Sequence, residues 1–219
     1  APKKIADTLV ANMELASDKY LTSAEVAGPG FINFRISHKW YEDVIRDINE
    51  QGKDFCRLDT GKGKTVNVEF VSANPTGPMH MGNARGGVLG DALASVLEMA
   101  GYTVSREFYV NDAGNQIAKF AKSIDARYKQ LILGEDKVEF PEDGYQGYDI
   151  KVLAEEFRTE FGDDMLSEDE QSRRDKMAEF GLKKNIPAMQ EGLKRYGIDY
   201  DRWFFESELH NSNVVAETG

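Results

Sequence analysis

Hydrophobic and polar residues alternate along three short runs of the chain, as they do in β-strands that bury one face. The clearest run is TVNVEFVS, residues 65–72, in which every second residue from Val66 to Phe70 is apolar. Residues 103–110, TVSREFYV, form a second run, and residues 31–37, FINFRIS, form a third that follows a Gly-Pro-Gly turn. We therefore predict strands in these three places.

Other stretches repeat their apolar residues every three or four positions, which is the period of an amphipathic helix. The sequence predicts helices at residues 1 to about 20, at 38–52, at 83–101 and at 115–133, with two or three more beyond a turn-rich segment at 134–149. Gly52 and Gly101 stand where the second and third of these helices should end, a common position for glycine.

Two of the predicted helices have an apolar stripe that we expect to face the core. In the helix at 83–101 the stripe consists of Leu89, Leu93, Val96, Leu97 and Ala100. In a later helix it consists of Leu182, Ile186, Met189, Leu193 and Tyr196. Pro187 interrupts that later helix, so it must lie in a first turn or at a kink.

The run 65–72, the helix at 83–101 and the run 103–110 make a strand–loop–helix–strand unit of roughly 45 residues. Such a crossover joins two parallel strands and recurs in doubly wound α/β sheets. We therefore predict an α/β fold, a Rossmann-like parallel sheet with flanking helices, in residues 61–219. The loop LDTGKGKT marks a domain boundary near residue 60, with a separate small domain in residues 1–60.

Composition limits the cellular setting and the class of partner. No apolar run approaches the roughly 20 residues that span a bilayer, and the first residues lack the apolar core of a secretory signal. The single cysteine, Cys56, cannot form an internal disulfide. We expect a cytoplasmic protein with no membrane partner.

The net charge of −11 argues against a general nucleic-acid binder, since such proteins have a basic footprint. It leaves room for a local basic face, for which the candidates are Arg173, Arg174, Lys176, Lys183, Lys184, Lys194 and Arg195. The simpler interpretation of these residues is solvated helix surface.

Residues 70–87, FVSANPTGPMHMGNARGG, connect a predicted strand to a predicted helix and hold more special residues than a turn needs. A loop in this position lies at the carboxyl edge of a parallel sheet, where ligands of open α/β folds bind. The helix start offers free N–H groups and a partial positive charge, which suit a phosphate group.

Four glycines stand at that helix start: Gly82, Gly86, Gly87 and Gly90. Each glycine inside a helix costs about 1 kcal/mol relative to alanine, so the protein must gain something from them. We expect that gain to be space, which lets a ligand or a neighbouring strand approach the backbone.

The dinucleotide-binding pattern G-x-G-x-x-G does not fit this loop. The tetrapeptide His80-Met81-Gly82-Asn83 is a variant of the HIGH motif of class I aminoacyl-tRNA synthetases and, more loosely, of cytidylyltransferase-like nucleotidyltransferases. Taken alone, His80 is more simply interpreted as a surface or helix-capping residue. The surrounding sequence instead favours its interpretation as the first histidine of a HIGH-type motif.

Several longer pieces strongly resemble arginyl-tRNA synthetases of the bacterial type. EFVSANPTGP, HMGNARG, GDALA, AGY and NDAGNQ stand at the spacing typical of that family, between residues 68 and 117. VAGPGFINF lies upstream, and FPEDGY and DRWFFESEL lie downstream. The resemblance covers nearly the whole chain, and a match in so many parts is highly specific.

The resemblance implies a reaction in two steps. L-arginine attacks the α-phosphate of ATP, which gives arginyl-adenylate and pyrophosphate, and the terminal ribose of tRNA(Arg) then attacks the adenylate. It also implies a helical insertion in the catalytic domain and, in residues 1–60, part of an α+β domain that contacts tRNA. We expect a monomer whose Mg²⁺ arrives with ATP. No protein-bound metal is expected, because the histidines are scattered and one cysteine cannot form a zinc cluster.

In this family the loop around the HIGH-type motif binds ATP. The resembling region is Ala73, Asn74, Pro75, Thr76, Gly77, Pro78, Met79, His80, Met81, Gly82 and Asn83. His80, Gly82 and Asn83 are by resemblance the catalytic and ATP-binding candidates. Arg85 either joins them in holding phosphate or forms a structural pair. Asn83 replaces the second histidine of the motif, so it either works as a neutral donor or weakens the site.

Glu69 lies on the strand that enters the loop, where an unpaired buried carboxylate is costly. A substrate guanidinium is its natural partner, and an edge salt bridge with Arg106 is the alternative. The resemblance assigns Glu69 and Asn74 to arginine contact, and Gln116 is a third arginine-binding candidate. The residues after the second strand either line the pocket or cap a helix: Asn111, Asp112, Gly114 and Gln116.

Members of the family are far longer than 219 residues. We find no KMSKS-like second signature and no helical anticodon-binding domain, and the chain closes on NVVAETG. We therefore expect an N-terminal fragment that does not catalyse arginine-dependent pyrophosphate exchange on its own. The alternatives are another HxGH-type nucleotidyltransferase and a non-catalytic tRNA-binding fragment.

Overall fold

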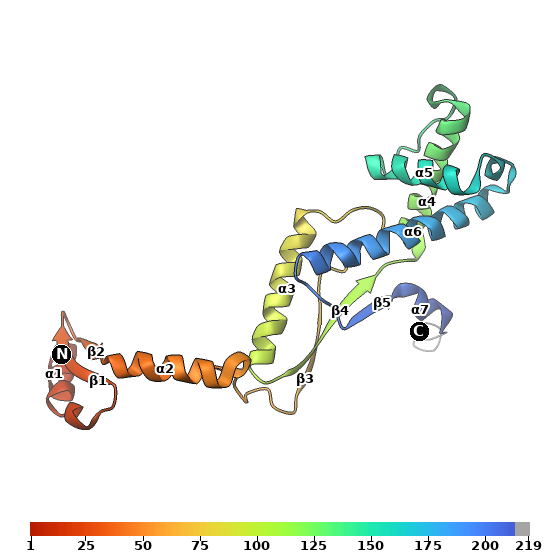
Figure 1. Cartoon of the computed structure of the whole chain (residues 1–219). Helices are drawn as coiled ribbons and strands as arrows, with labels where there is room; N and C mark the ends of the chain where they lie inside the picture. Colours follow the sequence, from red (N-terminus) through yellow and green to blue (C-terminus); the bar gives the residue numbers. More distant parts are fainter. Residues whose placement is uncertain (213–219) are drawn as a thin grey trace. The chain divides into compact units, whose positions relative to one another are not determined.

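The computed structural model describes residues 1–212 (Figure 1), so the final NVVAETG lies outside the described residues. The chain forms two compact units, Ala1–Arg57 and a larger one that begins at Leu58. The sequence placed a domain boundary near residue 60 from the loop LDTGKGKT.

The first unit contains two helices and an antiparallel hairpin. Its elements are α1 (Pro2–Ala11), β1 (Leu21–Ala27), β2 (Phe31–Ile36) and α2 (His38–Gln51), with 3-10 turns at Leu15–Ser17 and Gly52–Asp54. The strand predicted at 31–37 is present as β2. The helix predicted at 38–52 is present as α2, which ends where Gly52 adopts a φ of 55°.

The first predicted helix is wrong in its length. α1 ends at Ala11 rather than near residue 20, and the following segment enters β1, which the sequence pattern did not predict. Asp18 directs this change, because its Oδ1 accepts hydrogen bonds from the N–H groups of Tyr20 and Leu21 at 2.8 and 2.6 Å. β1 is then held by pairing with β2, a tertiary contact that helical periodicity does not reveal.

The second unit contains a parallel sheet with the strand order β3-β4-β5. Its elements are β3 (Thr65–Glu69), α3 (Met81–Met99), β4 (Thr103–Val110), α4 (Gly114–Leu133), α5 (Tyr148–Phe161), α6 (Glu170–Arg195), β5 (Arg202–Phe205) and α7 (Glu206–Asn211), with 3-10 turns at Glu135–Lys137 and Asp164–Ser167. The predicted strand–loop–helix–strand unit is confirmed as β3, α3 and β4. The α/β fold class is confirmed with it.

The pattern did not predict β5. Its four residues, RWFF, are too few to show a period, and pairing with residues 107–110 of β4 defines the strand. Its Trp203 stacks on Phe108 of β4 with ring centroids 4.3 Å apart. β5 thus brings a third strand end to the edge at which ligands of parallel sheets bind.

Between β4 and β5 the chain forms the helical insertion that the resemblance implied (Figure 1). α4, α5 and α6 pack around a hydrophobic cluster of their own, which includes Phe120, Tyr128, Phe157 and Phe180. A second cluster lies against the sheet and includes Val68, Phe70, Phe108 and Val110.

An ion pair inside the insertion joins α4 to α6. The Arg173 Nε lies 2.7 Å from the Asp125 Oδ1, and both side chains are buried. Burial alone would raise the pKa of the Asp125 carboxyl, but its hydrogen bonds and charge interactions with Arg173 and Lys129 together outweigh burial, and that pKa is lowered. The proposed basic face loses members to such pairs, since Arg174 also binds Asp125 and Lys176 binds Glu168.

Pro187 lies inside α6 rather than in its first turn, so the first-turn alternative is wrong. The helix segment before it packs in the insertion through Met177 and Phe180, and the segment after it packs against the sheet through Met189 and Leu193. One helix therefore belongs to both hydrophobic clusters.

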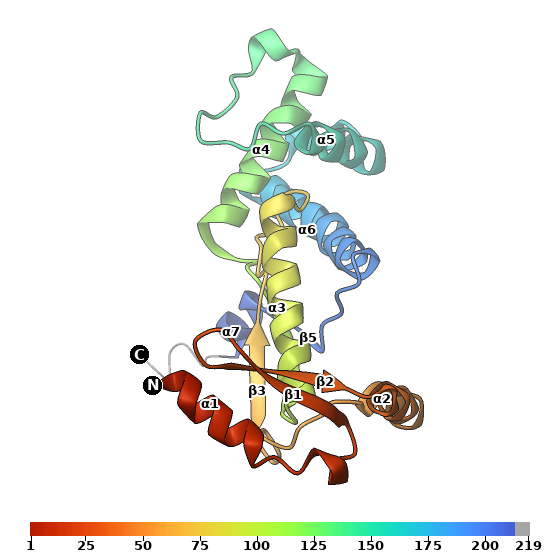
Figure 2. The same ribbon diagram turned by 90° about the vertical axis from the view of Figure 1, so that its left-hand side faces the viewer.

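The predicted apolar stripe of α3 is wrong for three of its five residues, while Leu97 does pack against the cluster at the sheet. Leu89, Leu93 and Val96 are 72, 51 and 65% exposed, and the residues that face the sheet are Gly87, Gly90 and Ala94. α3 lies so close to β3 (Figure 2) that a Cβ on Gly90 would stand 2.2 Å from the Phe70 ring. Small residues permit this approach, so part of the glycine-rich start of α3 makes room for a strand.

We predict that Gly90→Ala destabilises the protein by about 1–3 kcal/mol, because the new methyl group collides with Phe70. Gly86→Ala is the matched control, since its Cβ would meet no atom within 4 Å. The control should gain up to about 1 kcal/mol from helix propensity alone. Urea denaturation of both variants measures the difference, and equal midpoints would contradict the packing argument.

Candidate active site

The loop between β3 and α3 begins with a strained turn. Val71 and Ser72 have φ angles of 67° and 42°, a left-handed conformation that is rare for a β-branched residue such as valine. The Ser72 hydroxyl donates to the Glu69 Oε1 at 2.8 Å and accepts from the Tyr109 N–H at 3.2 Å. Ser72 thus ties the end of β3 to β4 and fixes the direction of the Glu69 carboxylate. Backbone strain of this kind is concentrated at functional sites.

The HIGH-type motif itself closes the first turn of α3. The His80 Nδ1 accepts a hydrogen bond from the Gly82 N–H at 3.1 Å, and the Asn83 Oδ1 accepts one from the His80 N–H at 2.9 Å. The capping role that the sequence left open for His80 is therefore present.

The same hydrogen bonds decide which atoms of the motif stay available to a ligand. Because the His80 Nδ1 accepts, Nε2 is the nitrogen that donates. Neither this Nε2 nor the Asn83 Nδ2 has a hydrogen-bond partner among residues 1–212. Two side-chain donors thus accompany the free N–H groups at the positive end of α3.

A cavity of 570 Å³ lies beside this loop. Its lining residues are Val71, Ser72, Ala73, Asn74, Thr76, Gly77, Pro78, Met79, His80, Asn83, Tyr145, Gln146, Gly147 and Asp149. Most of the predicted HIGH-type region forms one wall, and residues 145–149 of the insertion form the other. Of the other predicted site residues, Glu69, Gly82, Arg85 and Gln116 do not line it.

A second, more apolar cavity of 810 Å³ shares the rim formed by residues 77–80 and Asp149. Its far side is formed by α6, through Met189 and Leu193, and by Tyr196, which directly follows that helix. The start of α3 therefore stands between a polar and an apolar hollow.

Three strand ends bring carboxylates together at the sheet edge. Burial raises the pKa of the Tyr109 hydroxyl, and the nearby carboxylates of Glu206, Asp112 and Glu69 raise it further. Glu206 begins α7 directly after β5, and its carboxylate lies against the side-chain amide of Asn111. The sequence analysis missed Glu206, because β5 was missed and FFESEL entered only as part of the family resemblance.

Two alternatives from the sequence can now be decided. Glu69 does not pair with Arg106, whose guanidinium binds Glu98 at 2.7 Å and Asp91 at 3.3 Å. Asp112 does cap a helix, but the helix is α7, because its carboxylate accepts from the N–H and hydroxyl of Ser207 at 2.9 and 2.7 Å.

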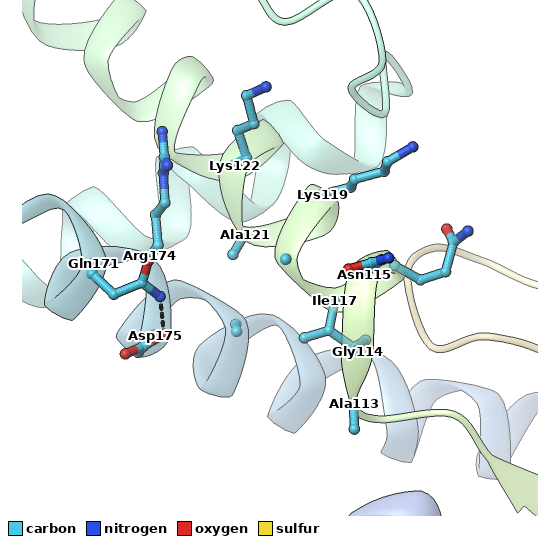
Figure 3. A pocket seen from close by; sticks show the side chains of 13 residues that line it. Ala113, Gly114, Asn115, Ile117, Lys119, Ala121, Lys122, Gln171, Arg174 and Asp175 are labelled. Atoms are coloured by element: carbon cyan, nitrogen blue, oxygen red, sulfur yellow. Dashed lines mark hydrogen bonds between the residues drawn. The ribbon is translucent and has the colours of Figure 1, made fainter.

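Arg85 and Gln116 lie apart from the cavity beside His80. Arg85 is exposed and has no ion pair among residues 1–212, so the structural pair proposed for it is not found there. Gln116 accepts a hydrogen bond from the Tyr145 hydroxyl and lines a groove of 610 Å³. Figure 3 shows this groove between α4 and α6. The cations of that groove are paired, Lys119 and Lys122 with Asp143, and Arg174 with Glu170.

Within residues 1–212, no group of three or more His, Cys, Asp and Glu side chains is placed to hold a metal ion. No helix in the same part of the chain is long and apolar enough to cross a bilayer.

Comparison with known proteins gives two family matches. Residues 45–181 match the catalytic domain of class I tRNA synthetases (R), and residues 1–36 match the arginyl tRNA synthetase N-terminal domain. The curated arginine–tRNA ligase of Acetivibrio thermocellus is 52% identical over 218 residues, and that of Caldanaerobacter subterraneus is 54% identical over 215. This chain is covered to 100% and 98% in these matches and spans 38% of the length of each relative.

A solved structure described as an arginyl-tRNA synthetase from Campylobacter jejuni matches with a TM-score of 0.70 at 34% identity. The match covers 83% of this chain and 40% of that one. The parallel sheet, with the crossover from β3 through α3 to β4, defines a Rossmann-like α/β domain. With the family matches, the chain belongs to the arginyl-tRNA synthetase family of class I synthetases.

We predict that Ser72→Ala destabilises the protein by about 1–2 kcal/mol, because it removes two hydrogen bonds and leaves the Tyr109 N–H without its partner. Ser167→Ala is the control, since that exposed hydroxyl bonds only the Asp164 carbonyl. The control should change stability by less than about 0.5 kcal/mol. Thermal unfolding of the two variants measures their stability, and an equal loss of stability in both would show that Ser72 does not anchor the loop.

Proposed function

We propose that the protein containing this chain is an arginine–tRNA ligase, which activates L-arginine with ATP and transfers it to tRNA(Arg). The observation that carries the proposal is 52% identity along the whole chain to a curated enzyme of that name. The chain spans 38% of that relative, so the activity is proposed for the protein at the length of its relatives. The family match favours this function over the HxGH-type nucleotidyltransferase.

The start of α3 is the proposed site for the triphosphate of ATP. The helix end, the His80 Nε2 and the Asn83 Nδ2 offer donors to phosphate oxygens, and Arg85 adds a cation on the first turns. Gly82 keeps the backbone at this point uncovered. Mg²⁺ arriving with ATP would neutralise phosphate charge, while the protein groups hold the α-phosphate in line for attack.

The sheet edge is the proposed site for arginine. A guanidinium and an ammonium need acceptors. Glu69 and Glu206 offer carboxylate oxygens near Tyr109, and Asn74, beside Asn111, offers an amide oxygen. Ser72 already orients the Glu69 carboxylate, so this side chain loses little conformational freedom when arginine binds. Gln116 stays an arginine-binding candidate through its bond with Tyr145.

We infer from the match of residues 1–36 to an arginyl tRNA synthetase N-terminal domain that the first unit contacts tRNA. The cytoplasmic location and the monomeric state stay predictions.

The function is tested by pyrophosphate exchange on the full-length protein, with arginine or lysine and with or without tRNA. We expect exchange with arginine and at least about a hundredfold less with lysine, since lysine cannot form the paired contacts of a guanidinium. Equal exchange with both amino acids, or none with arginine, would overturn the proposal. By contrast, the 219-residue chain alone should show no exchange.

We predict that Glu69→Gln and Glu206→Gln each raise the KM for arginine about tenfold or more, because each removes a charged acceptor for the cationic substrate. The KM for ATP should change by less than about threefold, since it binds at the start of α3. Glu179→Gln on the exposed face of α6 is the matched control. Steady-state kinetics of the full-length variants provide the measurement, and equal effects on both substrates would count against an arginine contact.

We predict that Asn83→His changes adenylation by less than about tenfold, because the position acts as a neutral hydrogen-bond donor. Asn83→Asp should instead raise the KM for ATP more than about tenfold, since a carboxylate there opposes the triphosphate. Its melting temperature should not fall, because an acidic residue in a first helical turn is favourable. A hundredfold loss in Asn83→His would reject the neutral-donor role.

A further inference from the structure

Asp149 is a carboxylate of the insertion that faces the HIGH-type loop and that no part of the sequence analysis singled out. It lies in the first turn of α5 and lines both the 570 and the 810 Å³ cavities. Those cavities meet at residues 77–80, so Asp149 stands across from the start of α3. The following inference rests on the proposed binding of ATP there.

The segment that carries Asp149 is fixed to α4. The Tyr145 N–H donates to the buried Ser123 hydroxyl at 2.9 Å, and that hydroxyl donates to the Lys119 carbonyl at 2.7 Å. The Tyr145 hydroxyl also donates to the Gln116 Oε1. These bonds hold the second wall of the cavity in place without any contribution from Asp149.

The Asp149 carboxylate lies in a space that two glycines leave open. A Cβ on Gly77 would stand 3.2 Å from its Oδ2, and a Cβ on Gly147 would stand 2.0 Å from its Oδ1. The side chain is half-buried, and among residues 1–212 it has no hydrogen bond and no ion pair. A negative charge without a counter-charge therefore faces the cavity beside the proposed triphosphate site.

A carboxylate and a triphosphate in one cavity repel each other unless a cation lies between them. Mg²⁺ meets this need, because it is commonly bound by one or two carboxylates together with substrate phosphates and keeps several waters. The described residues contain no cluster that could hold a metal without such phosphates. We propose that Asp149 is the protein's contact to the Mg²⁺ of Mg·ATP, so that metal and nucleotide bind as one unit between the insertion and the start of α3.

Two other roles for this carboxylate have different consequences. As a first-turn acid, Asp149 would only stabilise α5, so the neutral Asp149→Asn variant would lower the melting temperature and leave the metal requirement alone. As a contact for the arginine cation, it would change the KM for arginine and leave the metal requirement alone.

The test uses the full-length protein and its Asp149→Asn variant, with Mn²⁺ as an EPR-visible replacement for Mg²⁺. We expect Asp149→Asn to weaken binding of Mn²⁺ to the ATP complex, and to raise the Mg²⁺ concentration for half-maximal exchange, by about tenfold. ATP binding without metal, measured in EDTA by calorimetry, should be unchanged or tighter, because a repulsive charge is gone. The KM for arginine should stay within about twofold.

Gly147→Ala provides a second variant that keeps the carboxylate but displaces it. Gly147 has a φ of −59° and a ψ of 156°, which alanine adopts freely, so only the collision with the Asp149 Oδ1 is new. This variant should shift the Mg²⁺ requirement in the same direction by a smaller factor. Glu142→Gln, an exposed carboxylate before the segment that does not line either cavity, should leave it unchanged.

An unchanged metal requirement in Asp149→Asn overturns the proposal, whether the KM for arginine rises or only the melting temperature falls. The first result would assign Asp149 to the cationic substrate, and the second would assign it to the helix start. Failure of the proposed function itself is distinguishable, because the unmodified protein would then bind no ATP either with metal or in EDTA.

Discussion

The close packing of α3 on β3 determines where every candidate group of the second unit stands. Gly90 lets the helix approach the Phe70 ring, and Gly87 does the same for Ile198, where a Cβ would come within 2.8 Å of the side chain. With the helix axis fixed this closely, its first turn lies at the carboxyl edge of the sheet. A larger residue at Gly90 would move the positive end of the helix away from the carboxylates of that edge. Gly87 and Gly90 therefore fix the position of the helix.

Sequence patterns predicted the elements that have a clear hydrophobic period or a residue, such as glycine, that marks their end. The unit β3–α3–β4, the helix α2 with its end at Gly52, and the motif at His80 are of this kind. The patterns failed where partners decide the structure. β1 and β5 exist through pairing, and the face of α3 turned to the sheet consists of small residues, while periodicity selected Leu89 and its neighbours.

The site residues divide along the same line. His80 and Asn83 were found because they belong to one short motif of the chain, whereas Glu206 and Asp149 lie on elements far away in the sequence.

Negative charge also has a consistent distribution in the second unit. Carboxylates gather where the proposed substrate is cationic, and the first turn of α3, at the proposed phosphate site, has none. A net charge of −11 is thus compatible with binding a polyanionic nucleotide, because a helix end supplies the local positive potential.

The insertion must hold a fixed position if Asp149 is to act together with the start of α3. Two features provide this. α6 belongs to both hydrophobic clusters, so the insertion and the sheet share one continuous helix. The buried pair of Asp125 and Arg173 then locks α4 to α6, and removing one member of such a pair costs about 3–5 kcal/mol. Because Tyr145 is hydrogen-bonded to α4, the cavity wall formed by residues 145–149 is held in place as well. Preorganisation of this kind lets a single carboxylate and a helix end, on separate elements, meet one metal-bound nucleotide.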